Sequence, residues 1–194
     1  MKEELEICVK CYDSYEEIIS KLEGFGFEIR EDFQLNDIYM INKDIDINSV
    51  DDYQILSDYI LIRETVGKNK WLVHKYKIFN DKKEIVRQGK SQCKIIDVDK
   101  SKEFMESIGY KELFVIEDHN LLVSNGENEL YIQVLSSGDI YIEMEQKNIY
   151  SDNLNGNDID EMINNLNKYN LNIGDFYFEN KSINCLKSIK GEKV

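Results

Sequence analysis

A strict alternation of polar and apolar side chains constrains the fold of this chain more than any other feature of its sequence. In residues 4–11, Glu4, Glu6 and Lys10 share one side of an extended chain, and apolar residues such as Ile7 share the other. Strands of this kind have one polar face and one face for a hydrophobic core, as in antiparallel sheets. Later segments are expected to be strands as well: 37–41, 57–65, 70–79, 84–96, 112–123, 129–135 and 139–146.

Helices are expected between and after these strands. The first follows a candidate N-cap at Asp13 and has apolar residues at helical spacing within 18–22. Others are expected at 99–107, around 159–166 and at 182–189. Consecutive antiparallel strands with helical insertions indicate an α+β class.

The composition is typical of a globular protein with one core. The chain has 194 residues, of which 42% are hydrophobic and 32% are charged, so it is long enough for one domain and short for two. No low-complexity linker interrupts it, and we expect residues 1–194 to form a single domain. No run approaches the roughly 18 apolar residues of a membrane span. The four cysteines are too few and too scattered for a disulfide scaffold, which favours the cytoplasm.

The charge balance restricts the partners of this protein. Its formal net charge is -14, and a field of that sign repels nucleic acid and anionic membrane surfaces. We therefore expect neither nucleic acid nor membrane among its partners. An anionic ligand would need a local cluster of cations that overrides the global charge.

Several strands place specific charges at period two on their polar faces. These charges are Glu4, Glu6, Lys10, Arg63, Lys75, Lys77, Arg87, Glu143 and Glu145. For any one strand, a solvated outer face explains such a pattern. If the faces instead turn inward, the carboxylates and cations meet and need water, a ligand or one another, because buried unpaired charge is costly. Paired carboxylates can hold a hard cation such as Mg²⁺ or Mn²⁺, and clustered Arg and Lys can hold a polyphosphate.

The order of these charged motifs resembles that of the CYTH family, which includes class IV adenylate cyclases and the thiamine and inorganic triphosphatases. The family has, in order, Glu-x-Glu-x-Lys, Gln-x-x-Asp-x-Tyr, Arg-x-Arg, Thr-x-Lys, Arg-x-Glu-x-Glu, Glu-x-Glu and Lys-Ser-Tyr motifs. In this chain they read Glu4-Leu-Glu6-Ile-Cys8, Gln34-Leu-Asn-Asp37-Ile-Tyr39, Leu61-Ile-Arg63, Val73-His-Lys75, Arg87-Gln-Gly89-Lys-Ser91, Glu143-Met-Glu145 and Lys181-Ser182-Ile183. The resemblance extends along nearly the whole chain.

The resemblance implies an α+β fold with a closed antiparallel eight-stranded β tunnel, the triphosphate tunnel fold, and flanking helices. It implies a small organic or inorganic triphosphate as ligand, bound with Mg²⁺ or Mn²⁺ and then hydrolysed or, for ATP, cyclised. The residues implied for the metal are Glu4, Glu6, Glu143 and Glu145, and those implied for the triphosphate are Lys10, Arg63, Lys75, Lys77 and Arg87. The sequence does not determine the substrate, and a homodimer stays open.

Departures from the family pattern predict weakened activity. The replacements are Cys8 for a lysine, Leu61 for an arginine, Gly89 and Ser91 for glutamates, Glu117 and His119 for a Lys-x-Arg pair, and Gln133 for an aspartate. A carboxylate such as Glu117 would oppose a bound triphosphate. The alternative is an inactive interaction or regulatory module, in which internal ion pairs fill the tunnel; full triphosphatase or cyclase activity is a third possibility.

Overall fold

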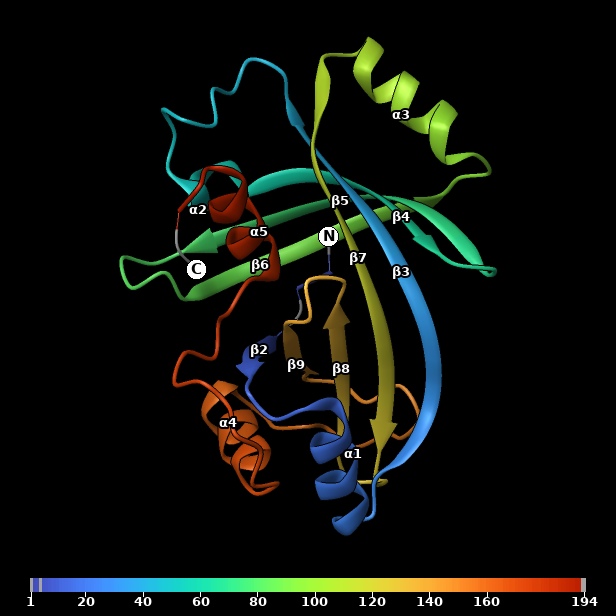
Figure 1. The fold of residues 1–194 in the computed structure, drawn as a ribbon, viewed down its shortest axis with the longest axis vertical. Coiled ribbons are helices and arrows are strands. Elements are labelled where there is room, and N and C mark those ends of the chain that lie inside the picture. Colours follow the sequence, from blue (N-terminus) through green and yellow to red (C-terminus); the bar gives the residue numbers. More distant parts are fainter. Residues whose placement is uncertain (1, 4, 193–194) are drawn as a thin grey trace. The chain divides into compact units, whose positions relative to one another are not determined.

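The alternating segments form nine antiparallel strands, and five helices connect or follow them in the part of the chain that this computed structural model describes, residues 2–3 and 5–192 (Figure 1). The strands are β1 (Lys2–Glu3), β2 (Glu6–Cys11), β3 (Glu28–Asn42), β4 (Asp58–Thr65), β5 (Asn69–Phe79), β6 (Ile85–Lys94), β7 (Tyr110–Ser124), β8 (Glu129–Leu135) and β9 (Ile140–Glu145). The helices are α1 (Tyr15–Gly24), α2 (Asp52–Ile55), α3 (Val98–Ser107), α4 (Ile159–Asn167) and α5 (Lys181–Ile189). The predicted α+β class is confirmed.

The strands follow one another in the order β1-β6-β5-β4-β3-β7-β8-β9-β2. The predicted closure of eight strands is wrong for the described residues, because this series is open and has β1 and β2 as its ends. The N-terminal segment forms two short strands that pair with different neighbours, β1 with β6 and β2 with β9. Strand β3 is also much longer than the predicted 37–41, because residues 28–34 are mostly charged and none of them is buried, so they give no core-facing pattern.

The outer edge of β2 is covered by residues 172–179. The backbone N–H of Cys8 donates to the Tyr177 carbonyl at 3.0 Å, and the N–H of Glu179 donates to the Cys8 carbonyl at 2.8 Å. An exposed strand edge presents unsatisfied N–H and C=O groups, and this segment satisfies them. The end of the strand series is therefore protected without closure of the sheet.

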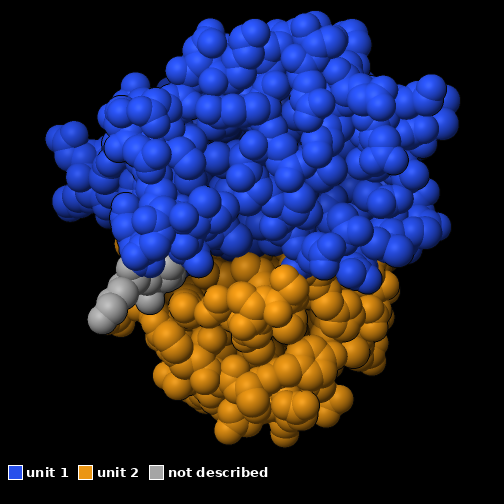
Figure 2. Space-filling view, turned by 45° about the horizontal axis from the view of Figure 1, so that its top comes forward, with its two compact units in different colours: residues 1–3, 34–117, 180–194 blue, residues 4–33, 118–179 orange. Residues whose placement is uncertain are grey.

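Residue contacts divide the chain into two compact units (Figure 2). Unit 1 comprises residues 1–3, 34–117 and 180–194, and unit 2 comprises residues 4–33 and 118–179. Strands β3 and β7 contribute residues to both units. The single domain stays a prediction.

Unit 2 has its own hydrophobic core on one face of its strands. Ile7 of β2 and Ile142 of β9 are fully buried there against Leu22 of α1 and Leu166 of α4. Helix α1 begins after Ser14, whose side chain accepts from the Glu17 N–H while the Glu17 carboxylate accepts from the Ser14 N–H, a capping box. The predicted N-cap Asp13 is therefore displaced by one residue.

Unit 1 uses both faces of its strands. On one face, Ile60 and Ile62 of β4 pack with Met40 of β3 and Met105 of α3. On the other face, Tyr39 stacks on Tyr59 with ring centroids 5.3 Å apart. That second face is the one that carries the charged residues described below. No helix in the described ranges has both the length and the apolar character needed to cross a membrane.

Candidate functional site

Three carboxylates of unit 2 come together on one face of β2 and β9. Glu6, Glu143 and Glu145 each offer an oxygen, and these oxygens all lie within 4.8 Å of one another. The antiparallel register places Glu6 opposite Glu145 and Cys8 opposite Glu143, and residues two apart on a strand share a face. The predicted metal residues Glu6, Glu143 and Glu145 are thus neighbours, whereas Glu4 lies outside the described residues.

A buried glutamine on the adjacent strand completes this carboxylate cluster. Gln133 of β8 is 6% exposed, and its Nε2 donates to Glu143 Oε2 at 3.0 Å. Its Oε1 is buried and has no hydrogen-bond partner. A buried hydrogen-bond acceptor without a partner lowers the free energy of unfolding by about 1–3 kcal/mol. The resulting donor set, three carboxylates and an amide oxygen, has the chemistry that a hard divalent cation prefers.

A phenol lies beside the same cluster. Tyr131 of β8 is opposite Glu143 in the β8–β9 register. Burial raises the pKa of Tyr131 far above its ordinary value, and the nearby carboxylates of Glu145 and Glu143 raise it further. The phenol is therefore protonated at neutral pH and can donate a hydrogen bond next to the carboxylate cluster.

Lys10 is the one predicted phosphate residue that belongs to unit 2. It lies on the same face of β2 as Glu6, and its Nζ is 3.0 Å from Asp139 Oδ1. The hydrogen bond from Lys10 holds the pKa of Asp139 below its usual range. Lys10 therefore already has a carboxylate partner on its own unit.

In unit 1, the predicted phosphate residue Arg63 is paired with a buried aspartate. Its Nε and Nη2 donate to the two oxygens of Asp37 at 2.7 and 2.6 Å. Asp37 is 1% exposed. Burial raises the pKa of Asp37, but the Arg63 guanidinium, with smaller effects from Lys181 and Lys75, more than offsets this and lowers it. Asp37 is thus an anion surrounded by cations.

Two further predicted residues share the face of Arg63. Arg63 is opposite Trp71, and the period of two along β5 brings Lys75 and Lys77 to the same face. Lys75 is in turn opposite Lys90 of β6. We call the four residues Arg63, Lys75, Lys77 and Lys90 the cationic face of unit 1.

Arg87 does not belong to this cationic face, contrary to the sequence-based expectation. It is opposite Ile78, so it lies on the other face of the sheet together with Gly89. The pairing of β5 with β6 is irregular next to Ile78 and Phe79. This irregularity begins after the pair of Ile78 with Arg87, so the regular register up to that pair fixes the face of Arg87. Alternation along the sequence does not specify that register.

Glu117 is also placed away from this face. Along β7, Phe114 and Ile116 are buried, whereas Glu117 and His119 are exposed. Phe114 contacts Tyr39, which shares the face of Asp37 because the two are two residues apart on β3. Glu117 lies on the opposite side of β7, so the expected opposition of Glu117 to a bound phosphate is wrong.

Comparisons with known proteins address the fold. The sequence matches no protein-family model and no curated protein. The solved structure of a protein from Vibrio parahaemolyticus described as a "putative adenylate cyclase" is similar, with a TM-score of 0.62 and 11% identity over 95% of this chain and 98% of that one. Another with the same description, from Bacillus halodurans, has a TM-score of 0.56 and 14% identity and covers 93% and 97%. This chain has a CYTH-like fold.

A third similar structure carries no activity in its description. It is a protein of Pyrococcus horikoshii, with a TM-score of 0.66, 18% identity and coverage of 95% of this chain and 99% of that one. At identities this low, the structural similarity establishes the fold alone. The function has to be argued from the residues of the site.

Several residues of these faces escaped sequence reasoning. Lys90 is outside the predicted set, because the alternation that contains Arg87 and Gly89 places Lys90 on the other face of its strand. Asn120 of β7 is opposite Gln133 and 1% exposed, and its Nδ2 donates to Asp118 Oδ1 at 2.8 Å. The apolar residues Phe114 and Ile116 are the signal in the sequence. Because they are buried, the even-numbered polar residues that follow on β7 share their face.

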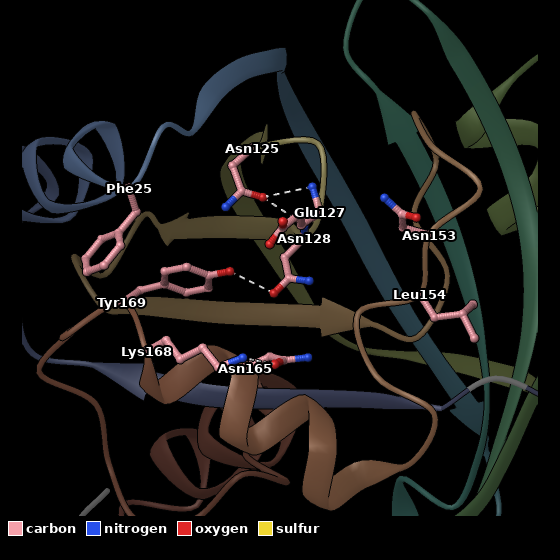
Figure 3. A pocket seen from close by; sticks show the side chains of 9 residues that line it. All are labelled: Phe25, Asn125, Glu127, Asn128, Asn153, Leu154, Asn165, Lys168 and Tyr169. Atoms are coloured by element: carbon pink, nitrogen blue, oxygen red, sulfur yellow. Dashed lines mark hydrogen bonds between the residues drawn. The ribbon is translucent and has the colours of Figure 1, made fainter.

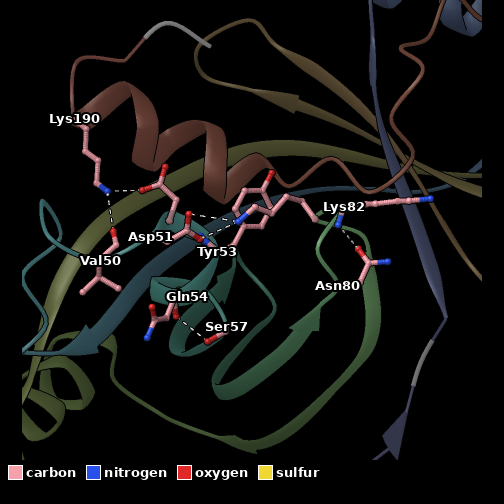
Figure 4. A network of polar contacts seen from close by, with 10 residues as sticks. Val50, Asp51, Tyr53, Gln54, Ser57, Asn80, Lys82 and Lys190 are labelled. Carbon is pink, nitrogen blue, oxygen red and sulfur yellow. Dashed lines mark hydrogen bonds and ion pairs between the residues drawn. The ribbon is translucent and has the colours of Figure 1, made fainter.

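Two other polar regions contain none of the predicted residues. Unit 2 has an open pocket of about 650 Å³ lined by asparagines and by Phe25 and Tyr169, and the Tyr169 hydroxyl donates to Asn128 Oδ1 at 2.7 Å (Figure 3). In unit 1, Lys190, the C-cap of α5, pairs with Asp52 and donates to the Val50 carbonyl at 3.5 Å (Figure 4). The second network ties α5 to the acidic segment before β4.

Proposed function

We propose that this CYTH-like protein binds a small triphosphate-bearing molecule, either a nucleotide, thiamine triphosphate or inorganic triphosphate, together with Mg²⁺ or Mn²⁺. The observation that carries the proposal is the segregation of charge on the polar strand faces. Unit 2 concentrates Glu6, Glu143 and Glu145, and unit 1 concentrates the cationic face. On a chain of net charge -14, a group of cations on one strand face supports an anionic ligand.

Glu6, Glu143 and Glu145 would hold the divalent cation, and Glu4 is a further candidate from the resemblance. The ion would supply neutralisation of charge on the phosphate oxygens. Tyr131, protonated beside these carboxylates, offers a hydrogen-bond donor to an oxygen of the ligand. These roles follow from the chemistry of the donor set.

The phosphates would be bound by the cationic face of unit 1. Asp37 fixes the orientation of Arg63 through its paired hydrogen bonds and removes one unit of positive charge. Lys181 is close enough to lower the pKa of Asp37, so it adds a positive charge near this pair. The negative charge of Asp37 still reduces the attraction of the face for phosphate. The expected affinity is therefore lower than that of a face with the same cations and no carboxylate.

The proposed activity is phosphohydrolysis or adenylate cyclisation at a reduced rate. Cys8, on the strand that carries Glu6, replaces the lysine of the family motif, which removes a cation from the neighbourhood of Glu143. The replacements at Gly89 and Ser91 do not contribute to the proposed reduction in rate, because both residues lie on the face away from Lys75. Phosphate release from tripolyphosphate and cyclic AMP formation from ATP would measure the activity, and the Cys8→Lys variant should raise it. Wild-type rates typical of enzymes would contradict the proposed weakening.

Titration calorimetry tests binding directly. Tripolyphosphate and ATP are titrated with and without Mg²⁺ or Mn²⁺. We expect heat of binding in the presence of metal, and a loss of affinity of about tenfold in Lys75→Gln, since one charge-assisted contact contributes about 1.5 kcal/mol. Arg87→Gln is the matched control, because Arg87 lies on the other face. No heat above that of buffer in any combination would overturn the proposal.

One observation favours a second function, that of a regulatory or interaction module without catalysis. The pair between Arg63 and Asp37 is an internal ion pair of the kind that would satisfy the polar face without a ligand. In that case neither tripolyphosphate nor ATP binds to the wild-type protein. Binding of either ligand with metal would exclude this alternative.

A further inference from the structure

The side chain of Gln133 has an arrangement that the packing of unit 2 does not explain. Its amide is anchored at one end, where Nε2 donates to Glu143 Oε2 at 3.0 Å. At the other end, Oε1 is buried without a partner. Because both atoms belong to one planar amide, the hydrogen bond from Nε2 to Glu143 fixes the direction of the orphaned oxygen and keeps it in the amide group that contacts the carboxylate cluster.

Unit 1 provides a comparison for this orphaned oxygen. Asn36 of β3 also has a buried Oδ1 without a partner. However, Asn36 precedes Asp37 and so points to the opposite face of β3, where its register partner is Glu64. Among the described residues, only Gln133 combines a buried oxygen without a partner with a hydrogen bond to a carboxylate of the cluster. This combination indicates an acceptor prepared for a cation.

We propose that Gln133 is the neutral ligand of the divalent cation held by Glu6, Glu143 and Glu145, a proposal that rests on the function proposed above. The amide oxygen binds the cation, while Nε2 keeps the Glu143 carboxylate in its orientation. A side-chain hydrogen bond to a ligating carboxylate is a common way to fix a metal ligand. The binding of the cation would satisfy the oxygen that is now buried without a partner.

The neutrality of Gln133 has a consequence for the anionic ligand. Three carboxylates and a divalent cation leave one net negative charge at the cluster. A fourth carboxylate would double this charge and repel a triphosphate more strongly. An amide oxygen instead adds a ligand without adding charge, so Gln133 favours the binding of a metal–triphosphate complex over the binding of the metal alone.

The test measures Mn²⁺ binding through the electron paramagnetic resonance signal of the free ion, so that it does not depend on activity. In Gln133→Leu, which has a similar volume and no polar atoms, Mn²⁺ affinity should fall at least tenfold. In Gln133→Glu, Mn²⁺ should bind more tightly than in wild type, whereas tripolyphosphate affinity in the presence of Mn²⁺, measured by calorimetry, should fall. Asn36→Leu is the control, and its Mn²⁺ affinity should equal that of wild type.

The outcomes separate this inference from the proposed function. If wild-type protein binds no Mn²⁺, both are overturned. If wild type binds Mn²⁺ and Gln133→Leu binds it equally well, only the role of Gln133 is overturned. If the Mn²⁺ affinity and the tripolyphosphate affinity of Gln133→Glu change in the same direction, the proposal that the neutral charge of Gln133 favours the triphosphate is overturned. Thermal unfolding of each variant without metal identifies any loss of fold.

Discussion

At the scale of single residues, Asp37 shows how a buried charge is stabilised. Its side chain is 2% exposed and that of Arg63 is 28% exposed, so the pair is largely removed from water. The two hydrogen bonds from Arg63 provide directional contacts as well as charge. Removal of one partner from such a pair leaves the other without compensation, and its cost exceeds that of breaking an exposed pair.

We expect Asp37→Asn to lower the free energy of unfolding by about 2–3 kcal/mol at pH 7, because it leaves the Arg63 charge uncompensated. Urea denaturation measures the effect. The control is Asp32→Asn, since Asp32 pairs with His119 in an exposed contact and its loss should cost under about 1 kcal/mol. Equal effects of the two substitutions would contradict this assessment of burial.

The same pair predicts a dependence of stability on pH. The folded pKa of Asp37 lies below its ordinary value of 3.8. A depressed carboxyl pKa contributes stability that is complete above the unfolded value and is lost as the pH falls through the folded value. The stability difference between wild type and Asp37→Asn should therefore be constant near neutrality and shrink below about pH 3.8. A difference that stays constant into this acid range would contradict the shift.

Thiol reactivity should follow burial. Cys93 of β6 is exposed, whereas Cys11 is 5% exposed and burial raises the pKa of its thiol. Since the thiolate is the reactive form, iodoacetamide should modify Cys93 of the folded protein first and Cys11 only after unfolding. Mass spectrometry of labelled peptides measures the order. Early modification of Cys11 in folded protein would contradict the placement of β2 over the core.

At the scale of elements, the first helix depends on a local signal. Ser14 and Glu17 satisfy each other's backbone N–H groups at the start of α1. Ser14→Ala should lower the free energy of unfolding by about 1 kcal/mol. Ser20→Ala is a control within the same helix, because Ser20 is exposed and alanine is the better helix former. Calorimetric or urea unfolding in which both substitutions have the same effect would exclude the cap.

The strands, in contrast, depend on contacts between distant segments, because the pairing with neighbouring strands decides which face each side chain occupies. The alternation in β6 is compatible with either face, and the regular pairing of Lys75 with Lys90 and of Ile78 with Arg87 decides that Lys90 joins Lys75 while Arg87 does not. In β7, the same ambiguity is resolved by the burial of Phe114 and Ile116. A one-residue error in register exchanges the two faces of a strand, which explains why Arg87 and Glu117 were misplaced.

At the scale of the whole molecule, two cores share two continuous strands. Ile62 belongs to the core of unit 1 and Ile142 to that of unit 2, while β3 and β7 contribute residues to both units. The loss of one unit would leave parts of both shared strands without their ladder partners. We therefore expect one cooperative thermal transition by scanning calorimetry, which Ile62→Ala and Ile142→Ala should each move to lower temperature as a whole. Two resolved transitions would contradict the predicted single domain.

The sequence by itself determined the α+β class, the antiparallel strands and the order of the charged motifs. These features come from local periodicity, which any extended strand with one buried face must show. The sequence also predicted Glu6, Glu143 and Glu145 as ligands of one metal ion. Their proximity in the structure follows from the pairing of β2 with β9.

Only the tertiary structure decided which polar side chains meet and which point away. The pairing of Arg63 with Asp37, the place of Lys90, and the orphaned oxygen of Gln133 beside Glu143 depend on strand register and on packing from distant segments. The hydrogen bonds of residues 172–179 with the edge of β2, an end of the open strand order, are likewise tertiary contacts. Such contacts join residues far apart in the chain, and a period-two pattern holds no information about them.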